Sequence, residues 1–171
     1  MSKTITVRLS ASGIDKAVHE LREYKLNVER KAKELVQMLC DDGQQIAVIQ
    51  AENINMTGNL LSSIKSHTNG NAGVVTCECG YAVFVEFGTG IVGNSHQHPD
   101  IAILGWKYDV NSHGDLGWWY PTTAADKNKY KYRKKNGDYL AWTKGMPSRP
   151  FMYNTAQELK NLVIPYARSL F

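Results

Sequence analysis

The chain has 171 residues, of which 43% are hydrophobic and 21% charged, and its formal net charge is +4. These values fit one globular domain over residues 1–171 that is large enough to bury a core of its own. The first nine residues lack the apolar segment of a signal peptide, and no run of about 18 apolar residues occurs, so we expect a soluble protein made in the cytoplasm without membrane contact.

The N-terminal third predicts a strand followed by helical structure. Residues 4–9 alternate apolar and polar side chains, which is the period of a half-buried strand. Ser12 is a predicted N-cap with Asp15 in the capping-box position, so a helix should start near residue 13. Apolar residues then recur at steps of three and four and predict a long amphipathic helix over about 24–53. The whole stripe comprises Ile14, Val18, Leu21, Val28, Ala32, Leu35, Leu39, Gly43 and Ile46.

Gly43 leaves two interpretations of this helix open. Glycine costs about 1 kcal/mol relative to alanine inside a helix, so Gly43 could end one helix and a second could begin at Gln44. The unbroken stripe favours one continuous helix. In that case Gly43 would allow a strand or helix to approach the backbone closely.

A β-hairpin is predicted after the helix. Thr57-Gly58-Asn59 should end the helix, because these residues tolerate positive φ, and residues 60–67 alternate weakly as a strand would. Asn69-Gly70 is a turn signal, and residues 74–79 are β-branched with a period of two. The two strands should therefore pair antiparallel.

The segment 81–87 fits two structures. Tyr81, Val83, Val85 and Phe87 alternate as in a strand, whereas Ala82, Val85 and Glu86 would share one side of a short helix. Gly88-Thr89-Gly90 ends the segment in either case.

Residues 91–126 are rich in Gly, His, Asn, Pro and Asp and lack sustained periodicity, which predicts a long excursion from the core. The excursion also holds Trp106, Tyr108, Trp118, Trp119 and Tyr120. So much aromatic surface normally packs against something, so we expect the excursion to be at least partly ordered.

The stretch 127–135 contains six basic residues and no acidic one, so the rest of the chain carries −2 of the total +4. Its lysines and Arg133 alternate with Tyr130 and Tyr132, and Asn136-Gly137 is a type I′ turn signal. Residues 138–142 can return alongside, which predicts a hairpin arm with one basic and one aromatic face.

The chain should close with a helix capped by Ser148. Its stripe comprises Phe151, Thr155, Ala156, Leu159, Leu162 and Val163. Pro165 should kink or shorten this helix near residue 164.

Cys40, Cys77 and Cys79 are odd in number, and Cys77 and Cys79 would lie on one face of a strand. This pattern fits neither a disulfide framework nor the paired C-x2-C units of a zinc site, so we expect buried thiols.

Three short motifs occur in a familiar order along the chain. They are Thr57-Gly58-Asn59-Leu60 with Ser63-Ile64, then Tyr81-Ala82 with residues 85–89, then Arg149-Pro150-Phe151. With the preceding long helix, this order resembles the neck or tail-completion (head-tail joining) proteins of long-tailed, non-contractile bacteriophages. The resemblance covers about residues 24–90 and 145–171. The excursion over about 91–145 departs from it, because shorter relatives have only a brief connection there.

The resemblance implies an α+β subunit with a small antiparallel sheet packed against a long helix and a C-terminal helix. It implies a non-catalytic structural protein of the virion, assembled in the host bacterial cytoplasm as a ring. The partners would be copies of itself, in a ring that exists in isolation or forms only on assembly, the head-connector protein, and the tail-tube or tail-terminator protein, with possible contact to packaged DNA. No cofactor is expected. The motif residues expected to pack or form interfaces are Thr57, Gly58, Leu60, Tyr81, Glu86, Phe87, Gly88, Thr89, Arg149, Pro150 and Phe151. The inserted arm would add interface residues Trp106, Trp118, Trp119, Tyr130 and Tyr132.

Two other functions stay open. His96, His98 and His113, with nearby aspartates, could supply the ligands of a metal-dependent hydrolase, although they fit no short metal motif and could equally be solvated loop residues. The basic and aromatic arm at 127–135 could bind nucleic acid, with cations on phosphates and rings on bases, or could be a solvated edge protected by lysines.

Glu86 is the carboxylate most expected to be partly buried, because it lies inside an apolar run. We expect a structural ion pair, with Arg149 or with an arginine of a neighbouring subunit, rather than a general base. Ser62 and Ser63 have no His/Asp constellation near them in sequence and should belong to the predicted strand.

Overall fold

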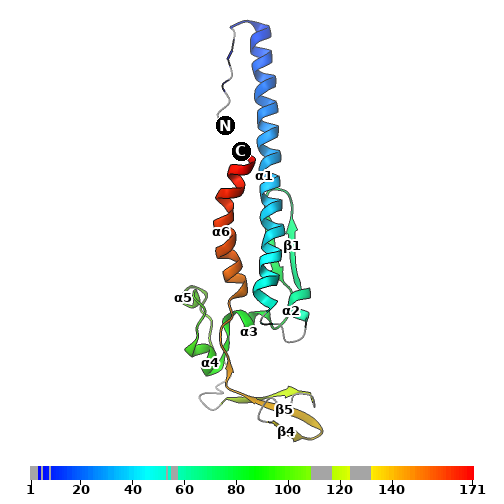
Figure 1. Ribbon diagram of the computed structural model, residues 1–171, viewed down its shortest axis with the longest axis vertical. Helices are drawn as coiled ribbons and strands as arrows, with labels where there is room; N and C mark the ends of the chain where they lie inside the picture. Colours follow the sequence, from blue (N-terminus) through cyan, green and yellow to red (C-terminus); the bar gives the residue numbers. More distant parts are fainter. Residues whose placement is uncertain are drawn as a thin grey trace.

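The computed structural model describes residues 4, 6–7, 9–52, 54, 58–108, 117–123 and 132–171. The described chain is elongated and built along one long helix, with a C-terminal helix on one side and a β-hairpin on the other (Figure 1). A second small sheet lies at the far end. The fold is therefore α+β, as the sequence predicts.

Helix α1 spans Ala11–Glu52 as one unbroken helix of 42 residues. It begins earlier than predicted, because Ser10 rather than Ser12 is the cap: the Ser10 hydroxyl accepts a hydrogen bond from the Gly13 amide at 3.2 Å. The predicted strand over 4–9 is wrong for the residues described there, which form no strand. A strand needs a partner for its backbone groups, and the described strands pair among themselves instead.

The helix continues through Gly43, as the unbroken stripe predicts. A Cβ atom at Gly43 would lie 3.0 Å from a methyl group of Leu159 and 3.0 Å from one of Val75. The missing side chain thus allows both the C-terminal helix and the hairpin to pack closely on α1.

The first hairpin pairs β1, Ile64–Thr68, antiparallel with β2, Gly73–Cys77. The Asn69 side chain stabilises the turn by accepting hydrogen bonds from the amides of Asn71 and Ala72 at 3.1 and 2.8 Å. The predicted strand starts four residues too early, because Asn59–Ser62 forms the short helix α2. Ser62 therefore lies in α2, and Ser63 precedes the strand.

Three short helices follow, α3 at Ala82–Phe87, α4 at Gly90–Ser95 and α5 at Ile101–Leu104. Helix α3 settles the ambiguity at 81–87 in favour of the helix, and its buried residues are Ala82, Val85 and Glu86. The residues that would share one side of a helix in sequence are thus the ones turned inward.

The far sheet has the order β3-β5-β4, with β3 at Trp118–Thr122, β4 at Tyr132–Lys135 and β5 at Asp138–Thr143. Strands β4 and β5 form the predicted hairpin around Asn136-Gly137, both of which have positive φ. The pairing of β3 with β5 was not predicted. The two-residue strand β6, Gly145–Met146, then bridges back to Thr89 and Gly90.

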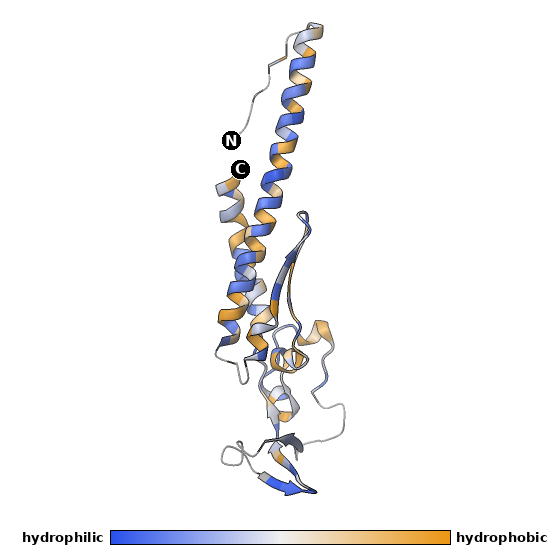
Figure 2. Cartoon of the chain, turned by 90° about the vertical axis from the view of Figure 1, so that its right-hand side faces the viewer, coloured by the Kyte–Doolittle hydropathy of each residue, from blue (hydrophilic) through white to orange (hydrophobic). Residues whose placement is uncertain are grey.

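Helix α6, Phe151–Leu170, runs antiparallel to α1 along its C-terminal half (Figures 1 and 2). Gln50 donates to Glu158 at 2.6 Å in the first half of α6, and Lys31 donates to the Leu170 carbonyl at its end. The helix does not end near residue 164, because it continues through Pro165. Residues 11–30 of α1 therefore extend past the end of α6.

The buried core lies where α1, α2, β1, α3 and α6 meet. Its members are Ala47, Ala51, Leu60, Ile64, Ala82, Val85 and Phe151. The three cysteines are free thiols, and only Cys40 is fully buried. Burial, together with the neighbouring Asp41 charge, raises the pKa of the Cys40 thiol above its ordinary value. Within the described ranges, no helix combines the length and apolar character needed to span a bilayer.

Candidate functional site

The three motif segments of the sequence meet at one place in the fold. Leu60 from the first, Val85 from the second and Phe151 from the third lie in the same buried cluster, and Phe151 is only 1% exposed. Gly58 adopts the left-handed conformation just before α2, with φ of 81°. Thr57 lies outside the described residues.

Backbone contacts tie the second and third segments together. The Arg149 amide donates to the Val85 carbonyl at 2.9 Å, and the Ser148 hydroxyl donates to the Glu86 carbonyl at 2.6 Å. The Ser148 hydroxyl therefore binds α3. The prediction that Ser148 caps α6 is wrong. Gly88 is required between these segments, since it has φ of 77° and a Cβ there would lie 2.6 Å from the Ser148 nitrogen.

Glu86 caps α6 from a different helix. Its carboxylate accepts hydrogen bonds from the amides of Met152 and Tyr153, both at 2.9 Å, in the first turn of α6. A third hydrogen bond comes from the Nε2 atom of His98 at 3.1 Å. Glu86 is 7% exposed, and His98 is 3% exposed. We call Glu86, His98 and the first turn of α6 the Glu86 joint.

The His98 ring is held from both sides. The Asp100 amide donates to Nδ1 at 3.0 Å, so Nδ1 is an acceptor and the proton sits on Nε2, where it is donated to Glu86. The ring also lies 4.6 Å from the Phe87 ring and 5.2 Å from the Tyr153 ring, measured between centroids. Both ring nitrogens are thus occupied by protein atoms.

Aromatic packing extends the joint toward the excursion. Trp106 stacks on Phe87 with ring centroids 5.1 Å apart and meets Phe84 edge-on at 5.9 Å. Its indole nitrogen donates to the Gly88 carbonyl at 3.1 Å. Trp106, expected in an interface arm, therefore packs against α3 in the body of the chain.

The other predicted residues take the following positions. Tyr81 precedes α3 and packs on the core, and the Thr89 hydroxyl accepts a hydrogen bond from the Met146 amide at 3.2 Å. Pro150 stands immediately before α6. Trp118 and Trp119 lie in β3 of the far sheet. Tyr130 and the side chain of Tyr132 lie outside the described residues.

The predicted pairing of Glu86 with Arg149 in the same chain is wrong. The partner is His98, and the Arg149 side chain is exposed while its backbone binds α3. The sequence suggests His98 only as a possible metal ligand and does not predict its pairing with Glu86, because His98 lies 12 residues away in a segment without periodicity. Within that segment, His98-Pro99-Asp100 indicates a turn, because proline and aspartate favour turns, but it does not indicate a contact with Glu86.

The histidine arrangement does not resemble a metal centre. His98 has no free ring nitrogen, the His96 ring lies against the Val92 carbonyl, and His113 is outside the described residues. Among the residues that the structure describes, no group of three or more His, Cys, Asp or Glu side chains is placed to hold a metal ion. His98 is also not the solvated loop residue that the sequence suggested as the alternative.

Several surface hollows lie away from the joint. One of them, about 1030 Å³, lies where the end of α6 meets α1 and is lined by Tyr24, Val28, Lys31 and Arg168 among others. A groove of about 380 Å³ lies between α1, β2 and α6, and a shallow one of about 650 Å³ lies beside Ser63 and Cys79. None of these three is lined by Glu86 or His98.

No protein-family model, curated protein or solved structure matches the chain.

Proposed function

We propose that the chain is a non-catalytic subunit of the neck or tail-completion complex of a long-tailed, non-contractile bacteriophage, and that its copies form a ring. The proposal starts from the order of the three motifs, which resembles that family. It is supported by their convergence on one buried cluster, to which they contribute Leu60, Val85 and Phe151. Motifs that are far apart in sequence then have one common structural purpose.

The observation that carries the proposal is an exposed apolar stripe on the free half of α1. Ile14, Val18 and Leu21 follow one another at steps of four and three and are 49%, 39% and 54% exposed. They lie on the part of α1 that extends beyond α6 (Figure 2), and Ala17 among them is 7% exposed. The free half, residues 11–30, is about 30 Å long at the rise of an α-helix.

Such a helix half gains stability when a neighbour covers it. Most helix stability in proteins comes from packing an amphipathic face, rather than from intrinsic propensity. Fully burying a large aliphatic side chain contributes about 1.5–3 kcal/mol, so side chains already half covered would add about 1 kcal/mol each. In a closed ring the same gain recurs at every subunit contact.

The proposed partners follow from this role. Copies of the chain would contact one another through the free half of α1, and the ring would join the head connector to the tail tube or tail terminator. The protein would then reside in the virion after assembly in the bacterial cytoplasm. The use of both Glu86 and His98 in internal hydrogen bonds supports a structural role for the most buried charged group.

Deleting the coding gene from the phage or prophage that carries it tests this proposal. We expect filled heads and finished tails that remain separate under electron microscopy, with infectivity restored when the protein is supplied from a plasmid. Joined, infectious particles without the protein would refute the proposed role.

A further inference from the structure

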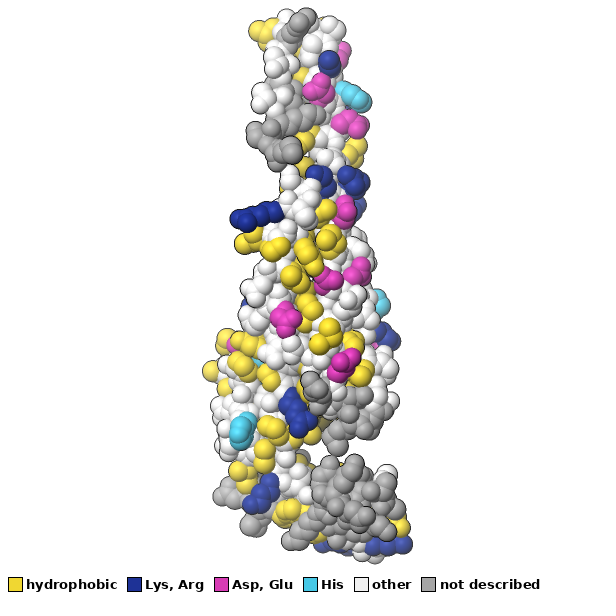
Figure 3. Space-filling view, viewed as in Figure 1, with side chains coloured by type: hydrophobic (Ala, Val, Ile, Leu, Met, Phe, Trp, Pro, Cys, Tyr) yellow, Lys and Arg dark blue, Asp and Glu magenta, His cyan; other side chains and the backbone are white. Residues whose placement is uncertain are grey.

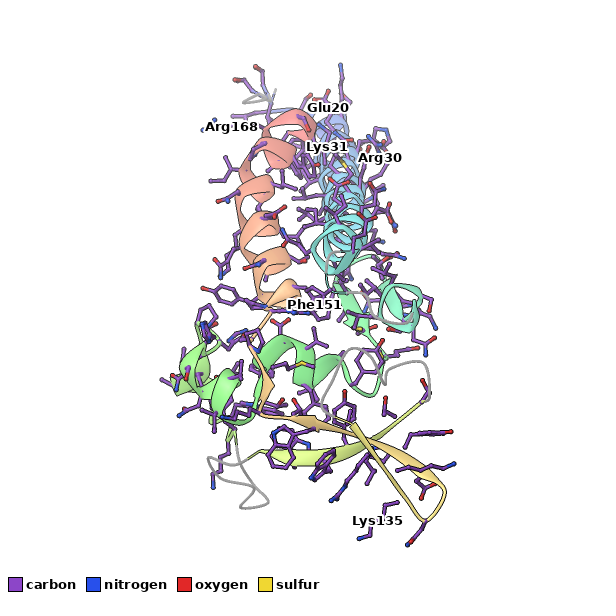
Figure 4. The ribbon with its side chains drawn as sticks, turned by 60° about the horizontal axis from the view of Figure 1, so that its bottom comes forward. Glu20, Arg30, Lys31, Lys135, Phe151 and Arg168 are labelled. Atoms are coloured by element: carbon purple, nitrogen blue, oxygen red, sulfur yellow. The ribbon has the colours of Figure 1, made fainter. Side chains whose placement is uncertain are left out.

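The far sheet ends in an exposed basic strand. Arg133, Lys134 and Lys135 follow one another in β4, all three are exposed, and β4 is an edge strand. Basic side chains mark the lower end of the molecule in Figure 3, and Lys135 lies far from Phe151 in Figure 4. This end of the chain is reachable by a large partner.

The positive charge of this strand is not neutralised locally. No carboxylate in the described part of the chain lies within ion-pair distance of these three side chains. Asp138 is the cross-strand neighbour of Lys135 in the ladder but forms no ion pair with it. The sequence just before β4 adds only basic charge.

Aromatic rings lie beneath two of the three cations. The Arg133 guanidinium lies 4.2 Å from the centroid of the Trp119 ring, and Trp119 meets Trp142 edge-on at 5.4 Å. The Lys134 ammonium lies 5.1 Å from the Tyr139 ring. A guanidinium stacked on an indole keeps the N–H groups in its plane available to a phosphate.

We propose that this basic tip, defined as Arg133, Lys134 and Lys135 with Trp119, binds nucleic acid through its phosphate backbone without reading base sequence. Uncompensated cations supply the affinity for phosphate, and the Trp119 ring beneath Arg133 holds its guanidinium in place. Basic residues on an edge strand can also serve only to prevent pairing with strands of other chains. Lysines alone would be enough for that purpose, whereas Arg133, held over Trp119, adds a preorganised hydrogen-bond donor. The proposal does not depend on the ring.

The test is binding of the full chain to fluorescein-labelled DNA, single-stranded and duplex, of mixed sequence. Fluorescence anisotropy over a series of salt concentrations gives the affinity and its salt slope. Changing all three basic residues of the tip to glutamine should weaken binding at least about tenfold and reduce the salt slope by about 2–3, because each phosphate contact contributes about 0.7–0.9. Trp119→Leu should weaken binding to single-stranded and duplex DNA alike severalfold, because the Arg133 guanidinium loses the ring that holds it.

A matched control removes the same charge elsewhere. The triple variant Lys33→Gln, Lys65→Gln and Lys160→Gln removes exposed charges from the body of the chain, outside both the tip and the free half of α1. It should bind DNA within about twofold of the natural chain, since its charges are remote from the tip. Circular dichroism checks that all variants fold. Absence of binding at low salt, equal loss in the two triple variants, or equally tight binding to polyglutamate would each overturn the proposal.

Discussion

Glu86 supplies from α3 the capping interaction that a side chain usually supplies from the end of its own helix. Helix α6 has no side-chain cap from Pro150, and its first-turn amides would otherwise lack partners in a buried setting. A carboxylate at this end also interacts favourably with the helix dipole. One side chain therefore fixes both where α6 begins and how it is oriented on α3.

Replacing Glu86 by glutamine should lower the free energy of unfolding by about 2–3 kcal/mol, because it removes a charge and one of the two acceptor oxygens that face Met152, Tyr153 and His98. Urea denaturation followed by circular dichroism measures this. Glu29→Gln, which removes only an exposed pair with Lys25, should cost about 0.5 kcal/mol or less. Equal losses in the two variants would show that the Glu86 joint does not stabilise the fold.

For Glu86, the sequence predicts a structural role but not the residue with which it pairs. Glu86 was expected to be buried and structural because it lies in an apolar run. Its pairing with His98 depends on how a segment without periodicity folds back over α3. Nothing local to either residue encodes that contact, so the nearest arginine in the motifs was the wrong choice.

Among the elements, α1 and its close contact at Gly43 organise the body. Leu159 of α6 and Val75 of β2 both pack against α1 at Gly43, where the helix has no side chain. A second helix and a hairpin can approach α1 together only because no side chain separates them.

Gly43→Leu should therefore destabilise the fold by about 1–3 kcal/mol, even though leucine is the better helix former, because the new side chain has no room between α6 and β2. Urea denaturation again provides the measurement. Gln45→Leu, at an exposed position two residues away, should change stability by no more than about 0.5 kcal/mol. A Gly43→Leu variant at least as stable as the natural chain would contradict the close contact.

The elements that the sequence predicted well are those determined by local chemistry. Both hairpins carry Asn-Gly turns, and α1 and α6 carry long apolar stripes. The wrong predictions concern strands, whose formation depends on a pairing strand elsewhere in the chain. An alternating pattern at 4–9 finds no pairing strand among the described residues, and β3 joins β5 across a distance in sequence that turn signals cannot bridge.

Across the whole molecule, two different surfaces lie at opposite ends. The free half of α1, with exposed Ile14, Val18 and Leu21, lies at one end, and the basic tip lies at the other (Figure 1). A short helical body held by the Glu86 joint separates them. This arrangement suits a subunit that contacts its copies at one level of an assembly and a polyanion at another.

The most direct test of the ring proposal is the mass of the purified chain in solution over a wide range of concentration, measured by analytical ultracentrifugation. Leu21→Glu and Leu104→Glu form a matched pair, because both leucines are exposed to a similar extent, 54% and 55%, but only Leu21 lies on the free half of α1. The account predicts a closed oligomer for the natural chain and for Leu104→Glu, and a folded monomer for Leu21→Glu. A natural chain that stays monomeric at every concentration, or an oligomer that Leu21→Glu leaves intact, would contradict it.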